Sequence, residues 1–122
     1  MELLIVFLIV LQLKHFYLDF IDQTEKELKY KGVYFDIRGM THSIKHGVCS
    51  SFCALIVLDL EMYYFMLSVL VGMLDFILHY HIDYIKSSRG PKDMNSKEFW
   101  IWFGGDQFAH QLTYILLVLT IF

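Results

Sequence analysis

The chain has 122 residues, of which 57% are hydrophobic and 19% are charged, and it carries a net charge of −3. A soluble domain has roughly 45–50% apolar and about 25% charged residues, so this composition predicts an integral membrane protein with a single domain, residues 1–122. It excludes a disordered chain and a disulfide scaffold. The acidic balance also excludes a strongly basic nucleic-acid-binding protein.

Four windows are long enough to cross a hydrocarbon core, which takes about 20 mostly apolar residues. The first lacks the basic start and the cleavage site of a signal peptide and is expected to remain in the mature protein. Polar loops over 24–39 and 86–97 and a tight hairpin over 59–61 connect the windows. The sequence therefore predicts an all-α, antiparallel bundle of four transmembrane helices, approximately over residues 2–23, 40–58, 62–85 and 99–122.

The basic residues predict how the bundle is oriented. All ten Lys and Arg residues lie within 14–45 or 86–97, in or beside the two long loops. The N-terminus, the hairpin and the C-terminus contain none. Because basic residues gather on the cytoplasmic side of a membrane, we expect cytoplasmic loops and both termini on the outer side.

Each window carries one pair of His or Asp side chains four residues apart, a spacing that puts both on one face of a helix. Ionisable side chains inside a membrane are costly and usually functional. In the predicted topology all four pairs fall in the cytoplasmic leaflet, within about two helical turns of one another. The pairs are His15 and Asp19, His42 and His46, His79 and Asp83, and Asp106 and His110.

These residue types predict a metal site. Imidazole nitrogens and carboxylate oxygens suit a divalent ion, with zinc expected first and iron or manganese as alternatives. Eight side chains exceed the needs of one tetrahedral ion, so either two ions or one ion with supporting carboxylates would fit. Asp19, Asp83 and Asp106 are expected to share ligation with catalytic general-base work. Further polar side chains are expected to bind substrate or support the ligands: Gln23, Asp75, His81, Lys86 and Gln107.

Several neighbours of the pairs have a simpler structural explanation. Cys49 and Cys53 continue the face of the span-two histidines, and we expect them to serve helix packing. Lys14 and Lys45 are expected to extend toward the membrane interface. The Gly104–Gly105 step, just before Asp106, would either admit a substrate or allow close helix packing.

The four blocks together resemble a family of small bacterial and phage membrane proteins, the domain of unknown function 3307. The pattern is HxxxDF over 15–20 with Gln23, HxxxH over 42–46, HxxxDYxK over 79–86 and DQxxH over 106–110. This resemblance implies a multi-pass protein of the bacterial inner membrane, of bacterial or phage origin, and supplies no function. More loosely, such proteins are similar to membrane-bound metal-dependent hydrolases.

Three functions fit these features. The first is a metal-dependent hydrolase acting on a lipid or a lipid-linked phosphate or ester in the cytoplasmic leaflet. The second is a non-enzymatic membrane factor, possible for a phage-encoded protein, that modifies the host envelope or a partner protein. The third is a proton- or ion-conducting His/Asp network, which would need an oligomer because the outer leaflet lacks a polar stripe. The bilayer and a lipid substrate are the expected partners, nucleic acid is not, and an oligomer is left open.

Overall fold

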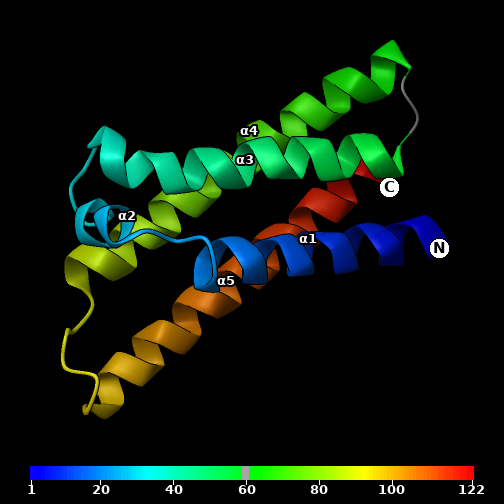
Figure 1. Ribbon diagram of the computed structural model, residues 1–122. Coiled ribbons are helices and arrows are strands. Elements are labelled where there is room, and N and C mark those ends of the chain that lie inside the picture. The colour runs from blue at the N-terminus through cyan, green and yellow to red at the C-terminus, as the bar shows by residue number, and fades with distance from the viewer. Residues whose placement is uncertain (59–60) are drawn as a thin grey trace.

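The computed structural model describes residues 1–58 and 61–122, and within them every regular element is helical. The prediction of an all-α chain is confirmed. The hairpin predicted over 59–61 lies mostly outside the described residues. In chain order the helices are α1 (Glu2–Phe20), α2 (Glu25–Tyr30), α3 (Ile37–Val57), α4 (Met62–Arg89) and α5 (Lys97–Ile121) (Figure 1).

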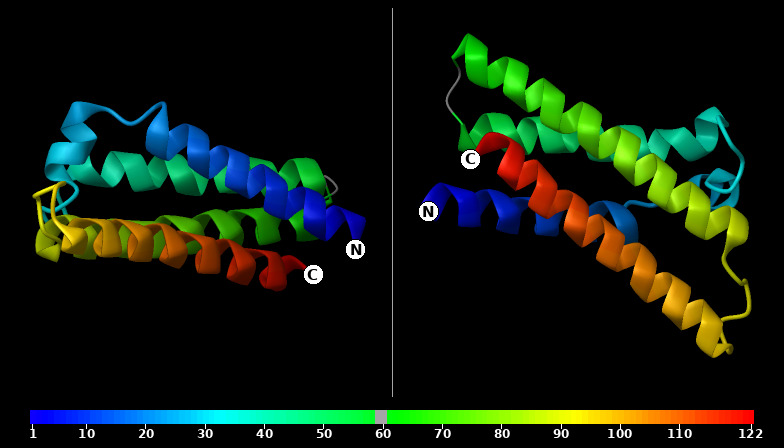
Figure 2. Two further views of the ribbon diagram at one scale, coloured as in Figure 1. Left: turned by 90° about the horizontal axis from the view of Figure 1, so that it is seen from below. Right: turned by 180° about the vertical axis from the view of Figure 1, so that it is seen from behind.

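The four long helices form a ring in which each packs against two others. α1 contacts α3, α3 contacts α4, α4 contacts α5, and α5 closes the ring on α1. Figure 2 shows α1 and α3 as one layer and α4 and α5 as the other. Successive long helices run in opposite directions, so both termini lie at one end of the bundle and α2 lies at the opposite end (Figure 1).

Glycines bring the backbones of α3 and α4 into contact. A Cβ on Gly72 would lie 1.9 Å from Oγ of Ser51 and 2.6 Å from the carbonyl oxygen of Gly47. No rotamer change relieves a clash with backbone, so both positions require glycine. This close approach brings the histidine-bearing faces of the two helices together.

Helix α2 was not predicted and forms inside the expected 24–39 loop. A capping box starts it: the Thr24 hydroxyl accepts from the Glu27 N–H, and the Glu27 carboxylate accepts from the Thr24 N–H. This pattern is a known helix start, but six residues are too few for a hydrophobic period to show. The long helices differ from the predicted windows by at most four residues per end, and the largest difference is the extension of α4 to Arg89.

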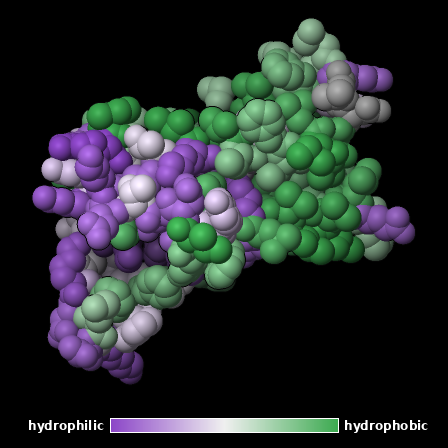
Figure 3. Space-filling model, in the orientation of Figure 1, coloured by the Kyte–Doolittle hydropathy of each residue, from purple (hydrophilic) through white to green (hydrophobic). Residues whose placement is uncertain are grey.

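Two of the helices are long and apolar enough to cross a membrane by length and composition. They are α1, with a mean hydropathy of 1.8 over its most apolar window, and α4, with 1.6. The windows predicted at 40–58 and 99–122 correspond to α3 and α5. On the face seen in Figure 3 the surface is hydrophobic toward the termini and hydrophilic toward α2.

The interior of the bundle changes character along its length. Toward the termini it is filled by apolar side chains and one tyrosine, and toward α2 it is filled by histidines and carboxylates. The apolar half contains Phe7, Leu11, Ala54, Val71, Tyr114, Leu117 and Val118. The polar residues therefore collect in one half of the bundle, the half farther from the termini.

Candidate metal centre

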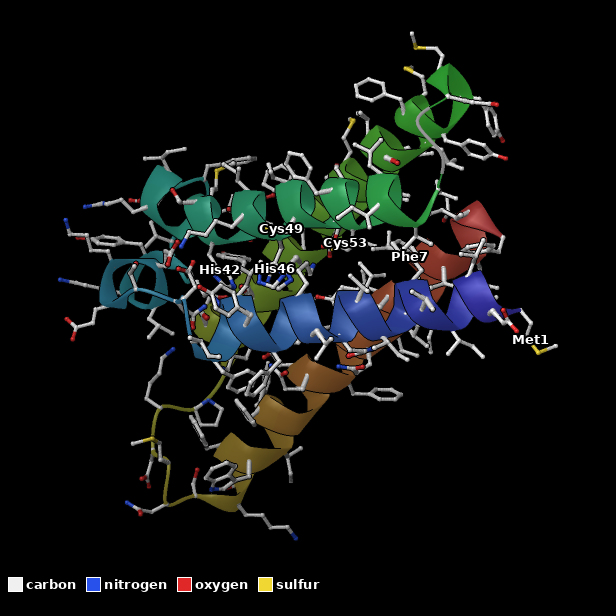
Figure 4. All side chains as sticks on the ribbon, turned by 45° about the vertical axis from the view of Figure 1, so that its right-hand side comes forward. Met1, Phe7, His42, His46, Cys49 and Cys53 are labelled. Carbon is white, nitrogen blue, oxygen red and sulfur yellow. The ribbon has the colours of Figure 1, made fainter. Side chains whose placement is uncertain are left out.

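Three helices direct four histidine rings to a common point in the polar half. The rings of His46 and His79 stack with centroids 3.6 Å apart, and the rings of His79 and His110 lie 4.1 Å apart. The ring of His42 lies 4.6 Å from that of His46. In Figure 4 both α3 histidines point from their helix toward the bundle interior. All four rings are fully buried.

A first group of ligand atoms gathers around one carboxylate oxygen of α1. Oδ1 of Asp19 lies 2.9 Å from Nε2 of His42, 3.0 Å from Nε2 of His46 and 3.7 Å from Nε2 of His79. One ligand atom from each of the four residues lies within 4.8 Å of the other three. Three imidazoles and one carboxylate match the ligand number and type of a tetrahedral zinc site.

A second group, sharing no residue with the first, combines α4 and α5. Nε2 of His110 lies 3.6 Å from Oδ1 of Asp106 and 3.7 Å from Oδ1 of Asp83. These three side chains also offer ligand atoms within 4.8 Å of one another. Two carboxylates and one imidazole form a harder ligand set than the first group. The geometry therefore offers two candidate ligand sets of different composition.

The most informative feature is a set of ring nitrogens without hydrogen bonds. Both nitrogens of His46, of His79 and of His110 lack a hydrogen bond of good geometry in the described part of the chain, although carboxylate oxygens lie 3.0 Å, 3.3 Å and 3.6 Å from their respective Nε2 atoms. Leaving one buried polar group unpaired costs about 1–3 kcal/mol, and here six such atoms occur on three neighbouring rings. Nitrogens that face carboxylate oxygens without hydrogen bonding to them are arranged as the ligands of a metal ion would be.

His15, predicted as a ligand, is held differently from the other histidines. Its Nε2 lies 3.0 Å from Oε1 of Gln107, and the Tyr114 hydroxyl lies 2.8 Å from its Nδ1. Because an amide oxygen only accepts, Nε2–H donates to Gln107 and Nδ1 accepts from Tyr114. Both nitrogens are thus occupied, although His15 lies close enough to His79 and His110 to form a third, overlapping group.

The supporting residues predicted from sequence separate into those at the centre and those away from it. Gln23 lies 3.2 Å from Nε2 of His42 through its amide nitrogen. His81 is exposed, and its ring donates to the Ile77 carbonyl within α4, so it lies apart from the centre. Gln23, Gln107 and Lys86 line a small polar pocket of about 60 Å³ together with the three carboxylates Asp19, Asp83 and Asp106.

Asp75 belongs to a separate polar layer on the side toward the termini. Its Oδ2 lies 2.6 Å from Nζ of Lys14 and 2.5 Å from Oγ of Ser50, and Lys14 also donates to Ser50. The expectation that Lys14 extends to the interface is therefore wrong, because its side chain is only 5% exposed. It turns inward because a buried carboxylate lies opposite it.

Lys31 and Tyr114 are functional candidates that sequence reasoning missed. Lys31 follows α2, is buried, and places Nζ 2.8 Å from Oδ2 of Asp83. Nothing distinguished it from the other basic residues of its loop. Tyr114 lies four residues after His110, so the same helical spacing that revealed the pairs could have identified it.

Ion pairs of Lys45 at the α2 end of the bundle hold α2 against α3. Nζ of Lys45 lies 2.8 Å from Oε1 of Glu27 and 2.8 Å from Oδ2 of Asp22. Burial raises the pKa of the Glu27 carboxyl, but Lys45 and the Thr24 donors outweigh burial and hold that pKa below its ordinary value. The ionised carboxylate thus anchors the segment that carries Lys31.

A model of the family described as protein of unknown function (DUF3307) matches residues 6–122 of the chain. The match includes all four blocks of His and Asp residues. No curated protein and no solved structure matches the chain. The function therefore has to be argued from the centre itself.

Proposed function

We propose that this chain, which belongs to the DUF3307 family, is a metal-dependent hydrolase that spans a membrane with four helices. The membrane part of the proposal is supported by two helices that are long and apolar enough to cross a membrane. It is also supported by the large apolar side chains that α1 and α5 expose, which a soluble monomer rarely shows. These include Leu3, Ile9, Leu13, Phe108, Leu112 and Leu119.

The single observation that carries the metal proposal is the set of six unpaired ring nitrogens on three buried histidines. A hydrogen-bond network would have paired these atoms, because polar groups in a low-dielectric interior gain most from partners. Bound divalent ions would take up one nitrogen of each of the three rings. Asp19 with His42, His46 and His79 would hold one ion, and Asp83 with Asp106 and His110 would hold a second.

The chemistry proposed is hydrolysis at the small polar pocket. A divalent ion there would polarise a phosphoryl or acyl oxygen and make water a stronger nucleophile. Asp83 and Asp106 line the pocket and would accept the proton of the attacking water. His15, fixed by Gln107 and Tyr114, would hold the α1 and α5 faces in register. Lys31 would balance the charge of Asp83.

The orientation proposed follows the basic residues. The end of the bundle that holds α2 would face the cytoplasm of a bacterial cell, with the centre in the cytoplasmic leaflet. Conduction through a single chain is disfavoured, because the interior between the centre and the termini is filled by residues such as Phe7, Leu11 and Leu117.

Metal analysis of the detergent-purified protein tests the proposal. We expect one or two equivalents of zinc, iron or manganese in the wild type, and a loss of about tenfold in occupancy for His46→Ala and for His110→Ala. His81→Ala is the matched control, since this histidine is exposed and lies outside the centre. A folded wild-type protein that takes up no divalent ion on reconstitution would overturn the proposal.

A further inference from the structure

A groove on the outside of the bundle leads to the proposed centre from the side. It lies between α4 and α5 and has a volume of about 350 Å³, within the range of small-molecule sites. Lys86 and Asp106 line both this groove and the polar pocket. The remaining lining is apolar or bare backbone: Ile82, Ile85, Ile101, Trp102, Gly105 and Ala109.

Glycine at position 105 is not explained by packing within the chain. A Cβ built on Gly104 or on Gly105 would meet nothing within 4 Å, whereas one on Gly72 would clash with backbone. Glycine in the middle of a helix costs roughly 0.5–1 kcal/mol relative to alanine. At Gly105 the missing side chain leaves the groove open immediately beside Asp106. The bare surface is therefore available to a ligand from outside the described chain.

Charge indicates which occupant fits. Three carboxylates and two ammonium groups line the polar pocket, those of Asp19, Asp83, Asp106, Lys31 and Lys86. The formal charges of these five groups sum to −1 without metal. The total becomes +1 with one divalent ion and +3 with two. The loaded pocket would therefore attract an anion, with Lys86 at the point where pocket and groove meet. An apolar groove that ends at a cationic pocket matches an amphiphile with a phosphate head and a hydrocarbon chain.

We propose that a phospholipid with a terminal phosphate enters the centre sideways from the membrane, laying one hydrocarbon chain in the α4–α5 groove and its phosphate beside Lys86 and Asp106. This proposal rests on the proposed function, because the anion is attracted only when metal is bound. It names the substrate class as a phosphate-bearing membrane lipid. Entry from the membrane would let a fully embedded centre receive a substrate that never leaves the bilayer.

Tryptophan fluorescence tests this directly, because Trp102 lines the groove and Trp100 does not. In a Trp100→Phe background Trp102 is the sole tryptophan. Phosphatidic acid with brominated chains is titrated into metal-loaded protein in detergent micelles. It should quench the fluorescence of Trp102 saturably. Phosphatidylcholine with the same chains should bind about tenfold more weakly. Chelation of the metal should weaken the binding of phosphatidic acid to a similar degree.

Two adjacent glycines supply the matched variants. Gly105→Leu fills the groove and should weaken quenching about tenfold, while Gly104→Leu, which is equally exposed but outside the groove lining, should leave it unchanged. Metal content is measured on the same samples, so loss of metal binding is distinguished from loss of lipid binding. Equal quenching by the two lipids, or equal behaviour of the two variants, would overturn the proposal. So would a dimer that Gly105→Leu dissociates and Gly104→Leu does not, since a second copy of the chain would then occupy the groove.

Discussion

The buried ion pair between Lys14 and Asp75 gives the sharpest test of the interior. Their side chains are 5% and 1% exposed, the charged atoms lie 2.6 Å apart, and Ser50 donates to the same carboxylate oxygen. Removing one member of such a pair leaves an uncompensated buried charge and costs about 3–5 kcal/mol. We therefore expect Lys14→Met and Asp75→Asn each to lower the free energy of unfolding by that amount.

The double variant separates the ion pair from simple loss of packing. With both charges gone, the remaining cost is that of lost hydrogen bonds, so the double variant should be about 3 kcal/mol more stable than the sum of the single effects predicts. Unfolding in mixed detergent micelles, followed by tryptophan fluorescence, measures this coupling. Arg38→Met is the control, because its side chain is 50% exposed and an exposed pair contributes about 0–1 kcal/mol.

Two results would refute this reasoning. Single effects that add to within about 0.5 kcal/mol would mean that the two charges do not interact in the folded protein. A loss of bound metal in the double variant would mean that Asp75 acts at the centre, although it belongs to none of the three groups of candidate ligands.

Two further predictions concern the frame around the centre. Gly72→Ala should lower the free energy of unfolding by about 1–3 kcal/mol, because its Cβ would overlap the Gly47 carbonyl. Gly104→Ala should leave that free energy unchanged or raise it. Thermal unfolding of the two variants checks this. The pKa of Glu27 is lowered on folding, so the stabilisation by its pair with Lys45 is complete above the ordinary carboxyl pKa of 4.5 and is lost as the pH falls through the lower folded value. Hydrogen exchange of the α2 amides should show this loss in the wild type and not in Glu27→Gln.

Helical spacing explains why much of the centre was predictable from the sequence. Residues four apart share a helix face, and the ends of the windows fix the depth of each pair. His42, His46, His79 and His110 therefore converge as expected. The same spacing places His81, two positions from His79, off the shared face, and the residue is exposed.

The misses come from contacts that join distant parts of the chain. Lys14 and Asp75 are 61 residues apart, and sequence spacing gives no reason to pair them. Lys31 reaches Asp83 only because α2 folds back over the end of the bundle, with Gly39 of α3 in backbone contact with Tyr30. Pairing between helices depends on how the helices are rotated and on which loop covers them, and neither follows from hydrophobic periodicity.

The charge of the buried cluster favours an ion over a network of hydrogen bonds. Asp19, Asp83 and Asp106 bring three negative charges into the polar half, and Lys31 supplies one positive charge close to them. With neutral imidazoles the remaining balance is −2, and unpaired charge is very costly in a low-dielectric interior. Protonated histidines could compensate, but rings stacked 3.6 Å and 4.1 Å apart would then repel one another. One divalent ion would offset this buried negative charge and would bind one free ring nitrogen each on His46 and His79.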